Sequence, residues 1–91
     1  MKKFRTLTTY QDSDYGNLFI EEKQVQNKPQ FTILWDFYLT HDEYKENCIS
    51  PEYDIWQEDT GLTDFTDMPK DGLFNTFEEA EKYLYKKFKK N

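Results

Sequence analysis

Apolar and polar residues alternate most regularly between residues 31 and 40. A period of two is typical of a β-strand that turns one face toward a core. The apolar residues at every second position are Phe31, Ile33, Trp35, Phe37 and Leu39. The pattern therefore predicts a strand over residues 31–40 with these five side chains on its buried face.

Other segments have the composition of shorter strands. Residues 3–10 and 18–25 are rich in β-branched and aromatic side chains, which suit a pleated surface. Residues 18–25 are expected to pair with residues 31–40 in a hairpin whose loop contains Pro29. Further short strands are predicted at 52–57, which carry Tyr53, Ile55 and Trp56, and at 62–65. The turn-forming residues at 11–17, the polar segment 41–51 and the segment 67–72 are predicted as connections.

The end of the chain has the signals of a helix. Thr76 and Glu79 have the spacing of a capping box, in which each side chain bonds to the backbone N–H of the other residue. Phe77, Ala80, Leu84 and Phe88 follow at helical spacing and define one apolar stripe. Acidic residues at the start and lysines at the end complement the helix dipole.

Several strands followed by one helix predict an α+β fold. We expect a small antiparallel sheet of about four to five strands, with one C-terminal α-helix packed on one face. The 91 residues form a single domain, 1–91, because the chain is too short for two cores. Aromatic residues make up 19% of the chain. Their large buried area compensates for a mean hydropathy of −1.03.

The second face of the sheet is predicted to be partly apolar. Leu34 and Tyr38 point away from the first set on the strand 31–40, and Trp56 opposes Ile55. One helix of about 15 residues is roughly 22 Å long and covers only one face. Two alternatives follow: the segments 41–51 and 64–72 cover the second face, or Leu34, Tyr38 and Trp56 are anchors for self-association, for example as a homodimer.

Charge is strongly segregated along the chain. The net charge is −6, but residues 41–81 hold thirteen acids against two lysines, a formal charge of −11, and both ends are basic. Such a field repels nucleic acid and attracts a basic groove on a protein. Acidic side chains on a rigid frame can also imitate the phosphate spacing of DNA. The alternative is ordinary solvation of an acidic protein.

Most chemistries lack the residues they need. Cys48 has no partner for an internal disulfide, and no segment approaches the length of a membrane span, so we expect a cytoplasmic location. His41 and Cys48 are too few for a structural zinc site and have no evident third group for nucleophilic catalysis. Residues 12–23 lack the glycine and glutamate positions of a calcium loop. We therefore expect no catalytic residues, no metal and no cofactor. The lysines at 82–90 are more simply helix-end charges than a direct nucleic-acid site.

Length, acidity and aromatic content together resemble small proteins of phages and mobile elements that block host defence. The junction 74–83, Phe-Asn-Thr-Phe-Glu-Glu-Ala-Glu-Lys-Tyr, is also similar to a strand-to-helix junction of small phage and Gram-positive bacterial proteins. The resemblance to anti-CRISPR and anti-restriction proteins implies a non-enzymatic inhibitor, often a DNA mimic.

The predicted function is thus the placement of an acidic surface in a basic, nucleic-acid-binding groove of a target protein. Loops are where binding residues concentrate, so the acids of the predicted loops are the expected contacts. These contacts are Asp42, Glu43, Glu46, Asp59, Asp64, Asp67 and Asp71.

Overall fold

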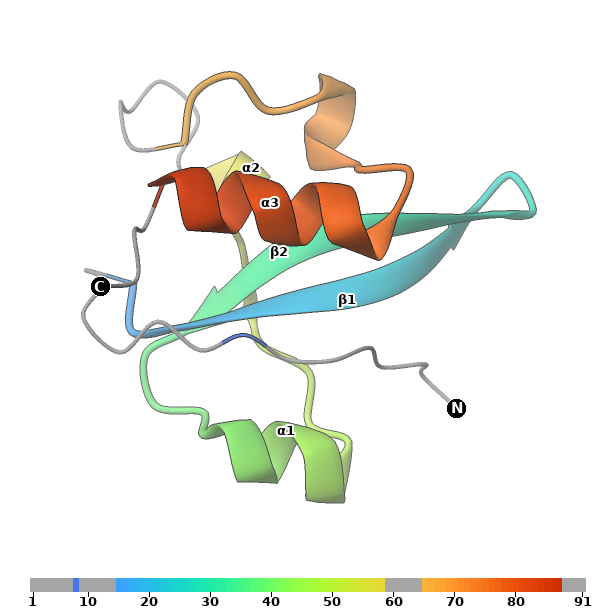
Figure 1. Cartoon of the computed structure of the whole chain (residues 1–91). Helices are drawn as coiled ribbons and strands as arrows, with labels where there is room; N and C mark the ends of the chain where they lie inside the picture. Colours follow the sequence, from blue (N-terminus) through green and yellow to red (C-terminus); the bar gives the residue numbers. More distant parts are fainter. Residues whose placement is uncertain (1–7, 9–14, 59–64, 88–91) are drawn as a thin grey trace.

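The computed structural model describes residue 8, residues 15–58 and residues 65–87 (Figure 1). Within these residues three antiparallel strands form one sheet in the order β1-β2-β3, which confirms the α+β class and the antiparallel sheet but not the predicted four to five strands. The strands are β1 (Asn17–Val25), β2 (Lys28–Asp36) and β3 (Tyr53–Asp54). The helices are α1 (His41–Asn47), α2 (Ile55–Glu58), α3 (Phe77–Lys87) and the short 3-10 helix η1 (Lys70–Gly72).

β1 and β2 form the predicted hairpin, but with a shorter loop. Gln26 and Asn27, with φ angles of 52° and 65°, make a two-residue turn between them. Positive φ at both turn residues matches the twist of the flanking strands. Pro29 therefore lies within β2, opposite Gln24, and not in a loop. β2 tolerates this proline because, on its side away from β1, β2 pairs with other residues only from Phe31 onward.

The first face of the sheet packs against α3 (Figure 1). Its core joins both long strands to the predicted apolar stripe of the helix, and it contains Leu18, Ile20, Phe31, Ile33, Phe77, Ala80 and Leu84. Half of the predicted capping box is present, because Thr76 Oγ1 accepts the Glu79 N–H at 3.1 Å. The C-terminal helix and the inward positions 31, 33 and 35 are confirmed, while Phe88 lies outside the described residues.

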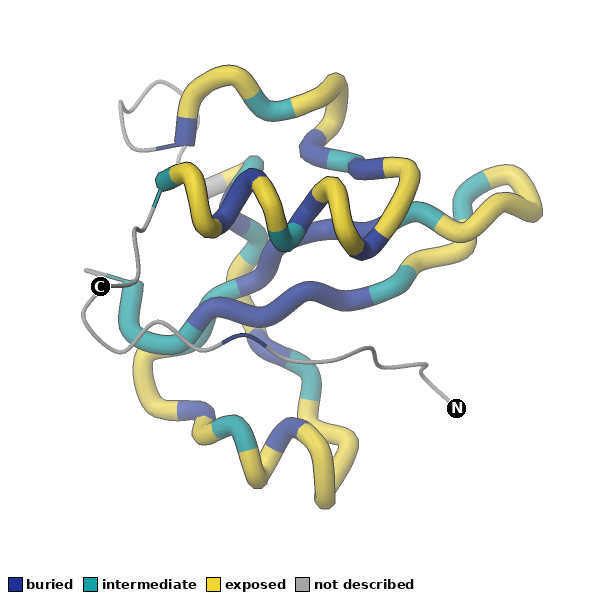
Figure 2. Tube along the Cα trace, viewed as in Figure 1, coloured by how far each residue is buried: buried dark blue, intermediate teal, exposed yellow. Residues whose placement is uncertain are grey.

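The second face is covered by a helix that was not predicted from the sequence. α1 lies on the opposite side of the sheet from α3, and its Tyr44 packs with Phe19 and Leu39 in a second core (Figures 1 and 2). Thr40 and Glu43 form a complete capping box at its start. The prediction of a polar connection at 41–51, and of a single helix, is therefore wrong. The Thr40–Glu43 spacing is the same signal that identified α3.

β2 ends four residues earlier than predicted. Asp36 Oδ1 accepts the backbone N–H groups of Tyr38 and Leu39, each at 3.0 Å, and turns the chain out of the sheet. As a result Phe37 is exposed, and Leu39 joins the core of the second face and not the first. The alternation of apolar and polar residues in 31–40 continues beyond the end of β2, where the chain is no longer a strand.

β3 is also shorter than the predicted strand 52–57. Asp54 Oδ1 accepts the N–H of Trp56 at 2.8 Å, and the chain enters α2 at Ile55. The predicted strands 3–10, apart from Thr8, and 62–65, apart from Phe65, lie outside the described residues. The expected loop 67–72 contains η1. Among the described helices, none has both the length and the apolar character to cross a membrane.

Candidate binding surface

The acidic residues predicted as contacts lie on two sides of the sheet. Asp42, Glu43 and Glu46 are exposed on α1, over the second face. Asp67 and Asp71 are exposed on the segment that carries η1, on the α3 side (Figure 1). The five predicted contacts that the structure describes thus lie in two groups on opposite sides of the sheet. Asp59 and Asp64 lie outside the described residues.

The three acids of α1 have different local roles. Glu43 Oε1 accepts from the backbone N–H and the hydroxyl of Thr40, at 3.3 and 2.9 Å, so Glu43 also holds the helix start. Asp42 and Glu46 are four residues apart and face the same side of the helix. Neither has a hydrogen bond or ion pair within the described part of the chain. They are the α1 carboxylates available to a partner.

The three residues predicted as self-association anchors do not share a face. Leu34 is only 8% exposed and belongs to the interior, so it is not a surface anchor. Trp56 is half-buried beside η1. A Cβ on Gly72 of η1 would lie 2.5 Å from the Cβ of Trp56. Tyr38 is 88% exposed. The segment containing α1 covers the second face, as the first alternative predicted for residues 41–51, but the part of residues 64–72 that the structure describes packs on the first face, against that prediction.

A cleft at the end of β2 was not predicted from the sequence. It has a volume of about 290 Å³ and is open to solvent. Aromatic and acidic side chains from β2, from the turn that follows it and from the start of β3 line it. These are Trp35, Asp36, Phe37, Tyr38, Glu52 and Tyr53, and we call this site the β2-end cleft.

Stacked rings form one wall of the β2-end cleft. Trp35 and Tyr53 are paired across β2 and β3, and their ring centroids are 4.5 Å apart at an interplanar angle of 22°. Tyr15 packs edge-on against Trp35, with a centroid distance of 5.4 Å. This packing fixes the indole, because neighbouring rings hold two sides of it.

Two features of the turn after β2 position Phe37 and Tyr38, which also line the cleft. The Asp36 side chain holds the turn that directs Phe37 and Tyr38 outward, and these residues are 55% and 88% exposed. Gly16 crosses this turn with a φ of 82°, and a Cβ there would lie 2.8 Å from the Cα of Phe37. Only glycine allows this close approach. The aspartate before two aromatic residues is the sequence signal for the turn, but it does not reveal the cleft.

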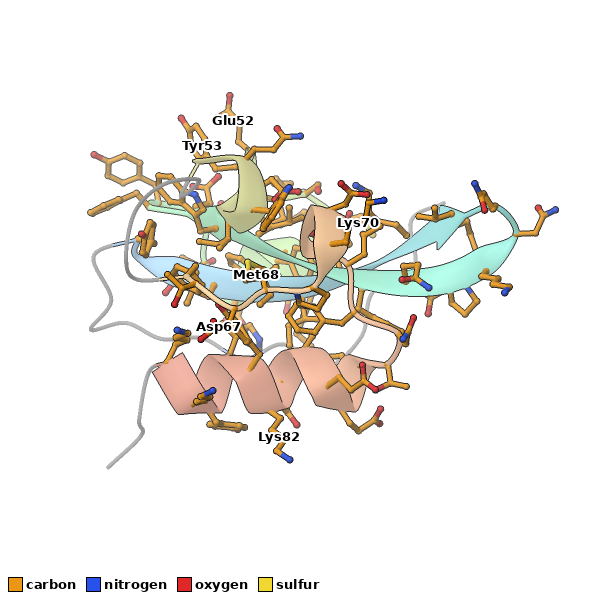
Figure 3. All side chains as sticks on the ribbon, turned by 90° about the horizontal axis from the view of Figure 1, so that it is seen from above. Glu52, Tyr53, Asp67, Met68, Lys70 and Lys82 are labelled. Atoms are coloured by element: carbon orange, nitrogen blue, oxygen red, sulfur yellow. The ribbon has the colours of Figure 1, made fainter. Side chains whose placement is uncertain are left out.

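The β2-end cleft carries negative charge only. Asp36 and Glu52 contribute carboxylates, and none of the six lining residues is basic. Figure 3 shows Glu52 and Tyr53 projecting from the edge of the molecule opposite to the one where Lys82 of α3 projects. Lys82 is thus separated from the cleft. The arrangement suits a ligand with positive charge.

A buried polar group fastens α1 to the sheet. Glu21, 5% exposed, accepts hydrogen bonds from Ser50 Oγ at 3.0 Å and from the Tyr44 hydroxyl at 3.4 Å. Burial, and then the nearby charge and hydrogen bond of Glu21, raise the pKa of Tyr44 well above its usual range. These groups lie beneath α1 and serve the fold.

The fold does not bring His41 and Cys48 together. His41 begins α1 and Cys48 follows its last residue, so the whole length of the helix separates the two side chains. No group of three or more His, Cys, Asp or Glu residues that could hold a metal occurs in the described ranges.

No family model matches this chain, and neither a curated protein nor a solved structure is significantly similar to it. The evidence for its function is therefore its own surface.

Proposed function

We propose that this protein is a non-enzymatic binding protein that contacts a basic protein through α1 and the β2-end cleft. The exposure of Phe37 and Tyr38 carries the proposal. Two neighbouring aromatic side chains in water forgo the free energy that burial would give them. Aromatic residues are enriched at protein interfaces, where a partner supplies that burial.

Charge supports a basic partner. Asp42 and Glu46 on α1 and Glu52 at the cleft follow the aromatic pair within one segment of the chain. Like charges grouped around an apolar patch steer an oppositely charged surface toward it and raise the association rate. A nucleic-acid-binding groove is a basic surface of this kind, and the proposed target is a nucleic-acid-handling enzyme that this protein inhibits, as anti-CRISPR and anti-restriction proteins do.

The proposal assigns different roles to the predicted acids. Asp42, Glu43 and Glu46 are in the contact surface. Asp67 and Asp71 face the other side of the sheet and are outside it. The two groups of acids can therefore be substituted separately and their effects on partner binding compared.

Affinity capture from a bacterial lysate at low and raised salt tests the proposal. We expect partner retention to fall at raised salt, because screening weakens attraction between exposed charges. The variant Asp42→Asn/Glu46→Gln should retain at least about fivefold less partner, while Asp67→Asn/Asp71→Asn should match the wild type. Retention that is insensitive to salt and to the α1 substitutions would contradict the proposed function.

Self-association is the second candidate, and the exposure of Tyr38 also favours it. An aromatic patch can bind its own copy across a two-fold axis. Sedimentation velocity over a range of concentrations separates the candidates. A monomer at all concentrations leaves binding to another protein, whereas a dimer that Tyr38→Ser dissociates supports self-association.

A further inference from the structure

We infer that the β2-end cleft receives one arginine side chain of the basic partner. This inference rests on the proposed function and makes it specific at one site. The cleft combines aromatic ring faces with two carboxylates, and both features recognise the same chemical group.

The ring faces favour a flat cation. Trp35 and Tyr53 stack at 4.5 Å and cover each other's facing ring faces, so the ring surface open to a ligand belongs mainly to Tyr53, 37% exposed, and to Tyr38, 88% exposed, which also lines the cleft. A guanidinium stacks on aromatic faces through cation–π attraction and is weakly hydrated, so it loses little on leaving water. The compact ammonium of lysine is more strongly hydrated and stacks less well.

The carboxylates supply acceptors for the fork of N–H donors. Asp36 uses Oδ1 to accept the Tyr38 and Leu39 N–H groups, which fixes the orientation of its side chain. Its Oδ2 accepts no hydrogen bond from the described residues. Glu52 is exposed and has no hydrogen bond or ion pair within the same part of the chain. Arginine–carboxylate pairs are short, charge-assisted and directional.

Size and charge argue against other occupants. The cleft volume of 290 Å³ is just below the roughly 300–1,000 Å³ of pockets that hold drug-sized ligands, and therefore suits one side chain. An apolar side chain would remove water from two carboxylates without replacing their hydrogen bonds, which is unfavourable. An acidic side chain would be repelled.

An NMR titration with short peptides tests the inference on the intact protein. The probes are acetylated, amidated Gly-Gly-Arg-Gly-Gly and the same peptide with lysine or with neutral citrulline in place of arginine. We expect the arginine peptide to shift the Trp35 indole N–H and the Tyr38 and Tyr53 amides. Citrulline should bind at least about tenfold more weakly and lysine at least about threefold more weakly, because each lacks the charge or the planar fork.

Matched variants locate the binding. Tyr38→Leu and Glu52→Gln should each weaken the arginine peptide at least about fivefold, because each removes a ring or a charge from the cleft. Tyr85→Leu, at a tyrosine that is 42% exposed on α3, and Glu79→Gln should leave it unchanged. Both cleft residues are exposed, so the fold is expected to persist, and the remaining amide signals report it.

The different failures are distinguishable. Equal binding of the arginine and lysine peptides, with shifts confined to α1, would overturn the arginine cleft and leave the proposed function standing. The absence of any shift at Trp35, or equal binding by the citrulline peptide, would also overturn it. If the cleft binds arginine but captured partners ignore salt and the α1 acids, the proposed function fails and the cleft remains.

Discussion

A carboxylate is buried between the sheet and α1. Glu21 lies on the second face of β1, and the Ser50 and Tyr44 hydroxyls donate to it. Burying a charge is unfavourable unless hydrogen bonds compensate, and these donors come from the segment that covers it. The site therefore ties the covering segment to the sheet by a polar contact as well as by the packing of Tyr44 on Phe19.

Tyr44→Phe should show a distinctive dependence of stability on pH. At pH 7 the variant loses a hydrogen bond to a carboxylate, which reduces the free energy of unfolding by about 1.5–3 kcal/mol. Folding raises the pKa of Tyr44 above its unfolded value of about 10. This contribution is therefore fully present below pH 10 and is lost as the pH rises further, by up to about 1.4 kcal/mol per pH unit.

Urea unfolding between pH 7 and 11.5 measures this effect. The wild-type curve should fall more steeply than that of Tyr44→Phe above pH 10, so the two converge. The six other tyrosines are common to both proteins and cancel in the comparison. Curves that stay parallel above pH 10 would show that Tyr44 ionises as easily in the folded state as in the unfolded chain.

α1 has only seven residues and depends on its surroundings. An isolated helix of this length is unstable in water, because nucleation is unfavourable and few bonds follow it. Two contacts hold it: the capping box of Thr40 and Glu43 at its start, and buried Tyr44 on its inner side. The chain leaves α1 at Cys48 in a left-handed conformation, with a φ of 53°.

Thr40→Ala should destabilise the protein, because the Glu43 N–H loses its acceptor. Loss of an N-cap of this kind costs about 1 kcal/mol. Thr40→Ser should retain most of the stability. Urea unfolding measures the loss, and faster hydrogen exchange of the Glu43 and Tyr44 amides locates it.

Thr76→Ala is the matched control for this prediction, because it removes the equivalent cap of α3 and should cost a similar amount of stability. Only Thr40→Ala should also weaken partner binding. An equal loss of binding for both variants would contradict the role of α1.

The whole molecule has a core on each face of one hairpin. Leu18 and Ile20 face α3, while Phe19 between them faces α1, and all three are fully buried (Figure 2). α3 and α1 thus each cover one face of the central part of the sheet. The exposed aromatic residues at the end of β2 lie where the sheet stops and neither layer covers them.

Leu34→Ala and Tyr38→Ala should therefore differ sharply in stability. Leu34 is buried, with 8% of its surface exposed. Truncation of such a side chain should reduce the free energy of unfolding by about 2–4 kcal/mol. Tyr38 is almost fully exposed, so its truncation should leave stability nearly unchanged. Chemical denaturation of both variants measures the difference. Similar losses would mean that Tyr38 packs against the protein in solution.

Local signals in the sequence determined part of this structure. The α+β class, the pairing of residues 18–25 with the following strand, and the start of α3 at the Thr76 cap were predicted, because periodicity and capping act over a few residues. The inward direction of Phe31, Ile33 and Trp35 follows from the same period. α1 was predictable in principle from Thr40 and Glu43, but its seven residues are too few to show an apolar stripe.

The tertiary structure alone decided the surface. Asp36 ends β2 and exposes Phe37, although the alternation of the sequence continues to Leu39. The β2-end cleft joins Trp35 to Tyr53 through strand pairing between residues eighteen positions apart. Acidic residues occur throughout residues 41–81. The chain passes from one side of the sheet to the other between α1 and η1, so the fold separates these acids. Which side chains share a surface depends on that path, and no local pattern of residues encodes it.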